Sequence, residues 1–235
     1  MSLSWGSVTG LGSRPRPATR GTALTEEYLR ARAKVLREGR RQAAGAVVDA
    51  IVHADLHALY RAMEQAERHW ALQDAMRACT RLPSLSVASR ETFLTVWLRS
   101  GDHIRMELGH DLLLTRALRV LLPPYDGQAI RLWRGETSYN RRRRTYGLSW
   151  TSEREVARAF ANGPAANTQG GSVLIGADVP ADAIICAPAL LGDTVGEAEY
   201  LVDRRRLKGV WVAERYPEVE MTAADDPPAL GSGLD

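Results

Sequence analysis

The sequence GEAEYLVD at residues 196–203 has the alternation of a β-strand. Successive side chains of a strand point to opposite faces, so Glu197 and Glu199 are predicted to share one face while Tyr200 and Val202 share the other, buried one. At a separation of roughly 6–7 Å two carboxylates repel each other, so such a pair is unfavourable in a protein core unless a cation or a polar substrate lies between them. The segment therefore predicts a core strand that brings two carboxylates to a cleft.

A second strand pattern, IRLWRG, occupies residues 130–135. Its alternation places Arg134 on the same face as Ile130 and Leu132. An arginine on an apolar face needs an anionic partner, which is either a carboxylate of the chain or a bound ligand.

A third pattern, GLSWTS at residues 147–152, comes just before a short helix predicted over residues 153–161. The prediction rests on a capping box formed by Ser152 and Glu155, with Phe160 one turn after another apolar residue. Ser149 is then expected at a strand end or turn directly before this helix.

In this order, Arg134, Ser149 and the pair Glu197 and Glu199 resemble the motifs of the Arg-Ser-Glu class of ADP-ribosyltransferases, over about residues 128–215. That class includes clostridial binary toxins, vertebrate arginine-specific ecto-enzymes and several phage and bacterial effectors. The resemblance implies an α+β fold, with a helical N-terminal region packed on a C-terminal, β-rich split β-sandwich. It also implies an NAD-dependent mono-ADP-ribosyltransferase, a glycosyltransferase that moves ADP-ribose from NAD to a protein acceptor, with arginine as the preferred acceptor.

The resemblance also assigns the two carboxylates. Glu199 would grip the ribose 2′-hydroxyl and stabilise the cation that develops as the N-glycosidic bond breaks. Glu197 would bind the acceptor guanidinium in fork geometry and position it for attack. Ser149 would orient Glu199, with Thr151 as the alternative source of this hydroxyl.

Three further residues are expected to hold the NAD substrate. Arg134 would meet a pyrophosphate oxygen, and the backbone of Gly135 would bind the nicotinamide amide, which a missing side chain permits. Phe160 would stack on the nicotinamide ring. The alternatives are ordinary ones: a solvated acidic pair, a structural ion pair for Arg134, a capping serine at 149 and a core aromatic at 160.

Two other functions stay open on the same residues. An NAD glycohydrolase would use water in place of the acceptor, and a catalytically silent module would keep the fold to bind a nucleotide or a partner protein. The two convergent carboxylates argue against a silent module, because pure binding gives little reason to hold them together.

Composition narrows the class of protein. The chain has 235 residues, 45% of them hydrophobic, which is enough to bury a full core. Its net charge is only +3, so the chain as a whole carries no strong electrostatic field. Apolar stretches stop well short of a membrane span, and the N-terminus has no signal-like apolar region, so we expect a cytoplasmic protein or one delivered to another cell without a cleaved signal. Cys79 and Cys186 fit no metal or redox spacing, so no metal is expected. Neither a membrane nor a nucleic-acid partner is expected.

The arginine runs 141–144 and 204–206 concentrate positive charge near the predicted site. They are read either as solvated loops or as contacts for the phosphates of NAD or for an acidic partner.

The order of elements is helices first and strands later. We expect a disordered arm over residues 1–23, a helical region over 24–126, the catalytic unit over 127–215 and a loose tail over 216–235. The expected helices are 25–40, capped by Thr25, then 44–79, 90–99 and 110–122. The expected strands are 129–134, 172–179, 183–187, 197–203 and 208–214.

Overall fold

The computed structural model describes residues 25–163, 168–188 and 198–218. The chain divides into two units, residues 1–38 and residues 39–235. The predicted arm at residues 1–23, most of the predicted tail at 216–235, and Glu197 all lie outside the described part of the chain.

In the first unit, the described residues form the beginning of helix α1 (Glu26–Val52). The Thr25 hydroxyl accepts a hydrogen bond from the backbone N–H of Tyr28 at 3.2 Å. The predicted N-cap is therefore confirmed, because this bond satisfies one of the backbone donors that the first helical turn leaves unpaired.

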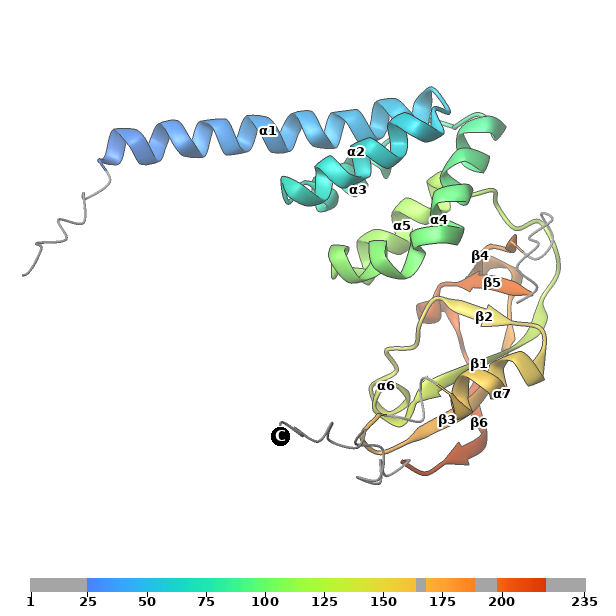
Figure 1. Cartoon of the computed structure of the whole chain (residues 1–235). Coiled ribbons are helices and arrows are strands. Elements are labelled where there is room, and N and C mark those ends of the chain that lie inside the picture. Colours follow the sequence, from blue (N-terminus) through green and yellow to red (C-terminus); the bar gives the residue numbers. More distant parts are fainter. Residues whose placement is uncertain (1–24, 164–167, 189–197, 219–235) are drawn as a thin grey trace, which may run out of the picture. The chain divides into compact units, whose positions relative to one another are not determined.

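The second unit contains the end of α1 and then four more helices before the sheet (Figure 1). They are α2 (Leu56–Arg68), α3 (Leu72–Cys79), α4 (Val87–Leu108) and α5 (Asp111–Leu121). Their apolar faces meet in one core, which includes Val47, Leu59, Met76, Phe93 and Leu118.

The expected continuous helix over residues 44–79 is wrong. It breaks twice, at Ala54 and Trp70, which both have a φ of 55° in the left-handed region. Such a residue ends a helix, and Asp55 then caps α2 by accepting from the N–H of Ala58 at 2.8 Å.

Within the described residues, the strands form one antiparallel sheet in the order β4-β5-β2-β1-β3-β6. The strands are β1 (Ile130–Thr137), β2 (Ser149–Thr151), β3 (Ser172–Val179), β4 (Ile184–Cys186), β5 (Glu199–Val202) and β6 (Val210–Tyr216). The expected succession of helices followed by strands, and thus the α+β class, is confirmed.

The sheet has two halves with a narrow junction. Strand β1 pairs with β3 along its whole length, but it meets β2 at a single register pair, Trp133 with Thr151. The halves β4-β5-β2 and β1-β3-β6 are therefore joined in the middle by little backbone pairing.

The faces of β5 separate two hydrophobic cores. Tyr200 and Val202 are buried on one face, as predicted, against Trp150 and Leu132. Leu201 lies on the opposite face and joins the helical core. Because side chains two residues apart share a strand face, Glu199 lies on the helix-facing side with Leu201.

Two predicted strand boundaries need correction. Strand β1 continues past Arg134 to Thr137, and β5 begins only at Glu199. Ala198, directly before it, has a φ of 46°, which is left-handed rather than extended. The strand alternation that placed Glu197 beside Glu199 therefore stops at Ala198.

Helix α7 (Arg154–Asn162) follows β2 as expected, but the predicted capping box is wrong. The N-cap is Glu153, whose side chain makes no capping bond, and its backbone N–H donates to the Thr151 hydroxyl at 3.0 Å. A short helix, α6 (Ser138–Arg143), also forms where no helix was predicted.

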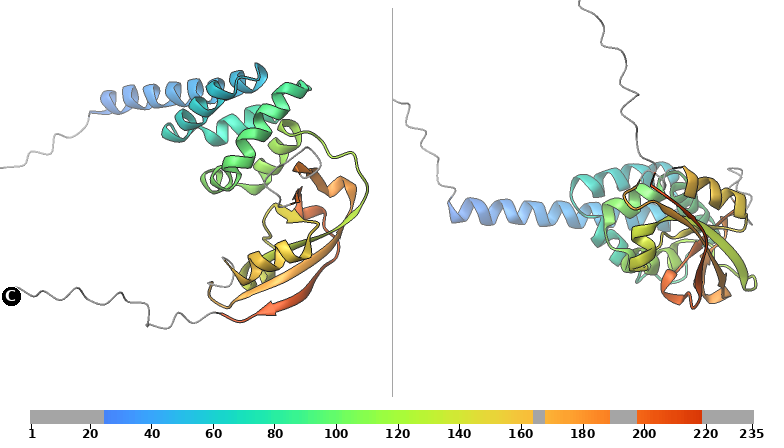
Figure 2. Two further views of the ribbon diagram at one scale, coloured as in Figure 1. Left: turned by 45° about the vertical axis from the view of Figure 1, so that its right-hand side comes forward. Right: turned by 90° about the horizontal axis from the view of Figure 1, so that it is seen from below.

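Helix α7 packs on β1, and α5 lies against β4 (Figure 2). No helix among the described residues has the length and apolar character needed to cross a membrane.

Candidate active site

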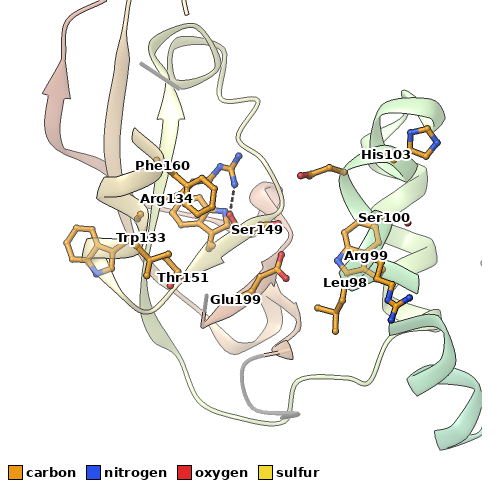
Figure 3. A pocket seen from close by; sticks show the side chains of 17 residues that line it. Leu98, Arg99, Ser100, His103, Trp133, Arg134, Ser149, Thr151, Phe160 and Glu199 are labelled. Atoms are coloured by element: carbon orange, nitrogen blue, oxygen red, sulfur yellow. Dashed lines mark hydrogen bonds between the residues drawn. The ribbon is translucent and has the colours of Figure 1, made fainter. Parts of the chain in front are cut away.

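A cavity of about 710 Å³ lies between the sheet and helix α4 (Figure 3). Its walls come from β1, β2, β5, α7 and α4. Every predicted site residue that the structure describes lines it, namely Arg134, Gly135, Ser149, Thr151, Phe160 and Glu199. The volume is within the range of about 300–1,000 Å³ that is usual for small-molecule sites.

Glu199 is the first residue of β5, and its side chain points from the sheet toward α4 (Figure 3). Thr151 is its direct partner across the antiparallel pairing of β2 with β5, and Ser149 pairs with Leu201. Direct partners have Cβ atoms about 4.5–5.5 Å apart, and diagonal neighbours are more distant. Of the two candidate hydroxyls, Thr151 is therefore the nearer in register to the carboxylate.

The Thr151 hydroxyl keeps its donor capacity. Its oxygen accepts from the N–H of Glu153, and a hydroxyl has one proton to donate as well as lone pairs to accept. Thr151 is 7% exposed, so its hydroxyl is largely shielded from water and lies beside β5, the strand that begins with Glu199. In Ser149, by contrast, it is the backbone carbonyl that accepts a hydrogen bond, from Arg134 Nη1.

Arg134 bridges the two halves of the sheet. Its Nη1 donates to the Ser149 carbonyl at 2.5 Å (Figure 3), and its Nε donates to Glu136 Oε2 at 2.9 Å. Neither bond uses Nη2. The anionic partner that the sequence required is thus present within the chain, and Arg134 links β1 to β2 where the backbone pairing is thin.

Glu136 is the residue of this site that sequence reasoning missed. It is 3% exposed and accepts from Arg134, from the Asn140 amide at 3.0 Å and from the N–H groups of Thr137 and Gly147 at 2.9 and 3.0 Å. Burial alone opposes ionisation, but the charge of Arg134 and the hydrogen bonds outweigh it, so the pKa of Glu136 is lowered. The signal was available, because strand alternation continued by two residues places Glu136 on the face of Arg134.

Gly135 is required by packing. A Cβ at this position would lie 2.4 Å from the backbone N of Ala161 and 2.6 Å from the carbonyl of Ala157. Helix α7 therefore approaches β1 this closely only because residue 135 has no side chain. This is a different reason for the glycine from the one the sequence suggested.

Phe160 projects from α7 into the cavity together with Val156. It is 46% exposed, so the interpretation of Phe160 as a core aromatic is wrong. An aromatic ring at the wall of a cavity offers a flat apolar surface to a ligand ring.

Helix α4 forms the wall opposite Glu199, with residues 97–103 lining the cavity. Trp97 is nearly buried there, and His103 Nε2 lies 3.0 Å from Glu67 Oε1. The sequence predicted a helix ending at residue 99 and gave no sign that it faces the carboxylate, because this contact joins distant parts of the chain.

The two cysteines and the arginine run at residues 204–206 are not among the residues that line this cavity. Burial raises the pKa of the Cys79 and Cys186 thiols to about 12. The arginines of the run are each ion-paired, Arg204 with Asp111 at 2.5 Å, Arg205 with Asp203 at 2.7 Å and Arg206 with Asp182 at 2.6 Å.

Among the residues described, no group of three or more His, Cys, Asp or Glu side chains is placed to hold a metal ion. Comparison of the chain with models of protein families, with curated proteins and with solved structures gave no match.

Proposed function

We propose that the protein is an NAD-dependent mono-ADP-ribosyltransferase that uses arginine as acceptor. The observation that carries the proposal is the gathering of Arg134, Ser149, Thr151, Phe160 and Glu199 in one cavity. These residues come from two strands of one half of the sheet, one strand of the other half and α7. Their selection rested on sequence motifs alone, so their convergence is independent support.

The architecture also supports the finer fold expected from the resemblance. A split β-sandwich needs two sheet halves that separate near the site, and β1 and β2 here share one register pair. Arg134 and the carbonyl of Ser149 hold this junction together at the wall of the cavity.

In the proposed reaction, the bond between C1′ of the ribose and the nicotinamide nitrogen breaks. Nicotinamide leaves with the bonding electron pair, and positive charge develops on the ribosyl group. The Glu199 carboxylate stabilises this charge and holds the 2′-hydroxyl. The Thr151 hydroxyl, opposite Glu199 in register, orients the carboxylate by donating its proton.

The other residues bind and position NAD. The half-exposed ring of Phe160 stacks on the nicotinamide. Arg134 binds the pyrophosphate through Nη2, because its Nε and Nη1 already donate to Glu136 and Ser149. A nitrogen of the acceptor guanidinium then bonds to C1′ and releases one proton. Glu197 positions that guanidinium in the proposal, although it lies outside the described residues.

An NAD glycohydrolase is the second candidate, and helix α4 is the observation that favours it. Because α4 faces Glu199 across the cavity, a protein acceptor has to reach the ribose past this wall, whereas water does not. The products separate the two functions, since only the transferase yields a modified arginine.

The test is incubation of the protein with labelled NAD and cell lysate, followed by mass spectrometry of labelled peptides and a free-nicotinamide assay. We expect labelled arginine and released nicotinamide. Glu199→Gln should lower both by at least about 100-fold, the scale of losing a main electrostatic stabiliser. The matched control is Glu155→Gln on α7, the same chemical change at a carboxylate that does not line the cavity.

Nicotinamide release without labelled arginine would favour the glycohydrolase. Wild-type protein that binds NAD but releases no nicotinamide would favour a binding module. Hydrolysis by Glu199→Gln at the wild-type rate would end the proposal for this carboxylate.

A further inference from the structure

A second cavity, of about 470 Å³, is lined by residues of α6, by the first residue of β3 and by the end of β6. Of the residues that the structure describes, none lines both this cavity and the cavity of Glu199. Three arginines line it: Arg141 and Arg142 from α6, and Arg215 from β6. No aspartate or glutamate is among the lining residues that the structure describes.

These arginines differ from the other arginine run of the chain. Every arginine at 204–206 has a carboxylate partner. In the described part of the chain, Arg141, Arg142 and Arg215 form no ion pair and no side-chain hydrogen bond. The positive charges of the run at 204–206 are therefore neutralised by carboxylates, whereas those of Arg141 and Arg142 are not, and these two arginines line a cavity.

One donor in this cavity is already desolvated. The Nε of Arg141 is buried and has no hydrogen-bond partner in the described structure. A buried donor without an acceptor costs free energy, and a shift of the Arg141 side chain toward a bound ligand would relieve this cost. The Glu218 carboxylate accepts from the N–H of Gly170, a residue that lines the cavity, at 3.0 Å.

We propose that this cavity binds the phosphate group of a small ligand, at a site separate from the one that holds Glu199. Guanidinium groups present planar forks of N–H donors that match phosphate oxygens, and three of them converge from two distant segments. The cavity has room for a diphosphate or a nucleotide. This inference does not depend on the proposed enzymatic function.

The test is calorimetric titration of the full chain with inorganic pyrophosphate. The first variant is the double change Arg141→Gln and Arg142→Gln, and its control is the double change Arg143→Gln and Arg144→Gln. The two proteins have the same composition and net charge, and the control residues do not line the cavity. We expect the first to weaken binding by at least about tenfold and the control to stay within about threefold of wild type.

A variant on the other segment keeps the test decisive if α6 tolerates no change. Arg215→Gln should also weaken pyrophosphate binding by about tenfold, whereas Arg131→Gln, a change at an arginine of β1 that lines neither cavity, should leave it unchanged. Pyrophosphate binding that is weakened by Arg134→Lys but not by Arg215→Gln would place the phosphate in the cavity of Glu199 and overturn the proposal. Absence of pyrophosphate binding to wild type would overturn it as well.

Titration with ADP distinguishes the sources of the phosphate. Tighter binding of ADP than of pyrophosphate, with the same loss on Arg215→Gln, identifies a nucleotide, and equal binding identifies inorganic phosphate. A single-stranded oligonucleotide that binds more tightly than either, and weakens equally in both double variants, would instead reveal a diffuse nucleic-acid surface and contradict a discrete site.

Discussion

Thr151 lies directly opposite Glu199 in the antiparallel pairing of β2 with β5. Its hydroxyl accepts from the N–H of Glu153 and still has a proton to donate. Ser149 is two register pairs further along, opposite Leu201. This register makes Thr151 the better candidate for the hydroxyl that orients the carboxylate.

The first prediction separates the two hydroxyls. Thr151→Val should lower NAD cleavage by about tenfold or more, because the carboxylate loses a donor, whereas Ser149→Ala should have a smaller effect. Thr151→Ser, which keeps the hydroxyl, should restore most of the rate. Initial rates of nicotinamide release measure all three. A larger loss in Ser149→Ala than in Thr151→Val would return the role to Ser149.

The second prediction concerns Glu197 and the acceptor. Glu197→Gln should abolish ADP-ribosylation of agmatine, an arginine mimic, yet retain much of the NAD hydrolysis, because water needs no guanidinium clamp. The two activities are assayed on the same preparation. An equal loss of both would show that Glu197 acts on NAD rather than on the acceptor.

The third prediction concerns the buried carboxylate of Glu136. Glu136→Gln should reduce the free energy of unfolding by roughly 2–4 kcal/mol, because it leaves Arg134 without its anionic partner in a partly buried place. Chemical denaturation at pH 7 measures this. The control is Asp178→Asn, which removes the partner of Arg131 in a well-exposed pair and should change the midpoint little.

The pH dependence of stability follows from the same group. The pKa of Glu136 is lowered from 4.5, so its ionised form stabilises the fold above that value. This contribution is lost as the pH falls from about 4.5 through the folded-state pKa. The wild type should therefore lose more stability than Glu136→Gln over this acid range, and parallel curves for the two proteins would contradict the assignment.

The fourth prediction concerns the contact of α7 with β1. Gly135→Ala places a methyl group against backbone atoms of α7 that cannot rotate away, so it should cost about 1–3 kcal/mol of stability. It should also weaken NAD binding, since α7 carries Phe160. Gly45→Ala in α1 is the control, because its Cβ meets nothing within 4 Å and the change should stabilise the helix by roughly 0.5–1 kcal/mol. A Gly135→Ala protein as stable as wild type would contradict the packing role.

Periodicity was sufficient to predict the main elements near the site. The strand β3 was predicted at its observed bounds, and the buried face of β5 was predicted from the alternation of Tyr200 and Val202. The α+β order followed from the change of hydrophobic period after residue 127. These features depend on which residues prefer water and which do not, a property that each segment carries by itself.

Local backbone geometry was harder to predict. Left-handed residues at Ala54 and Trp70 follow the ends of helices, and the left-handed residue Ala198 comes directly before the start of β5, although the hydrophobic pattern continued through all three. None of these is a glycine, so composition gave no signal of a turn at any of them. The position of Glu197 relative to Glu199 was inferred from a strand that the structure begins only at Glu199.

The sequence by itself determined the residue types of the site, the order of helices and strands, and the need of Arg134 for an anionic partner. Only the tertiary structure decided that this partner is Glu136, that Thr151 is the hydroxyl opposite Glu199, and that α4 forms the far wall of the cavity. The physical reason is the range of the interactions. Periodicity reflects contacts within a few residues, whereas strand register and ion pairing are set by which distant segments bury their apolar faces together.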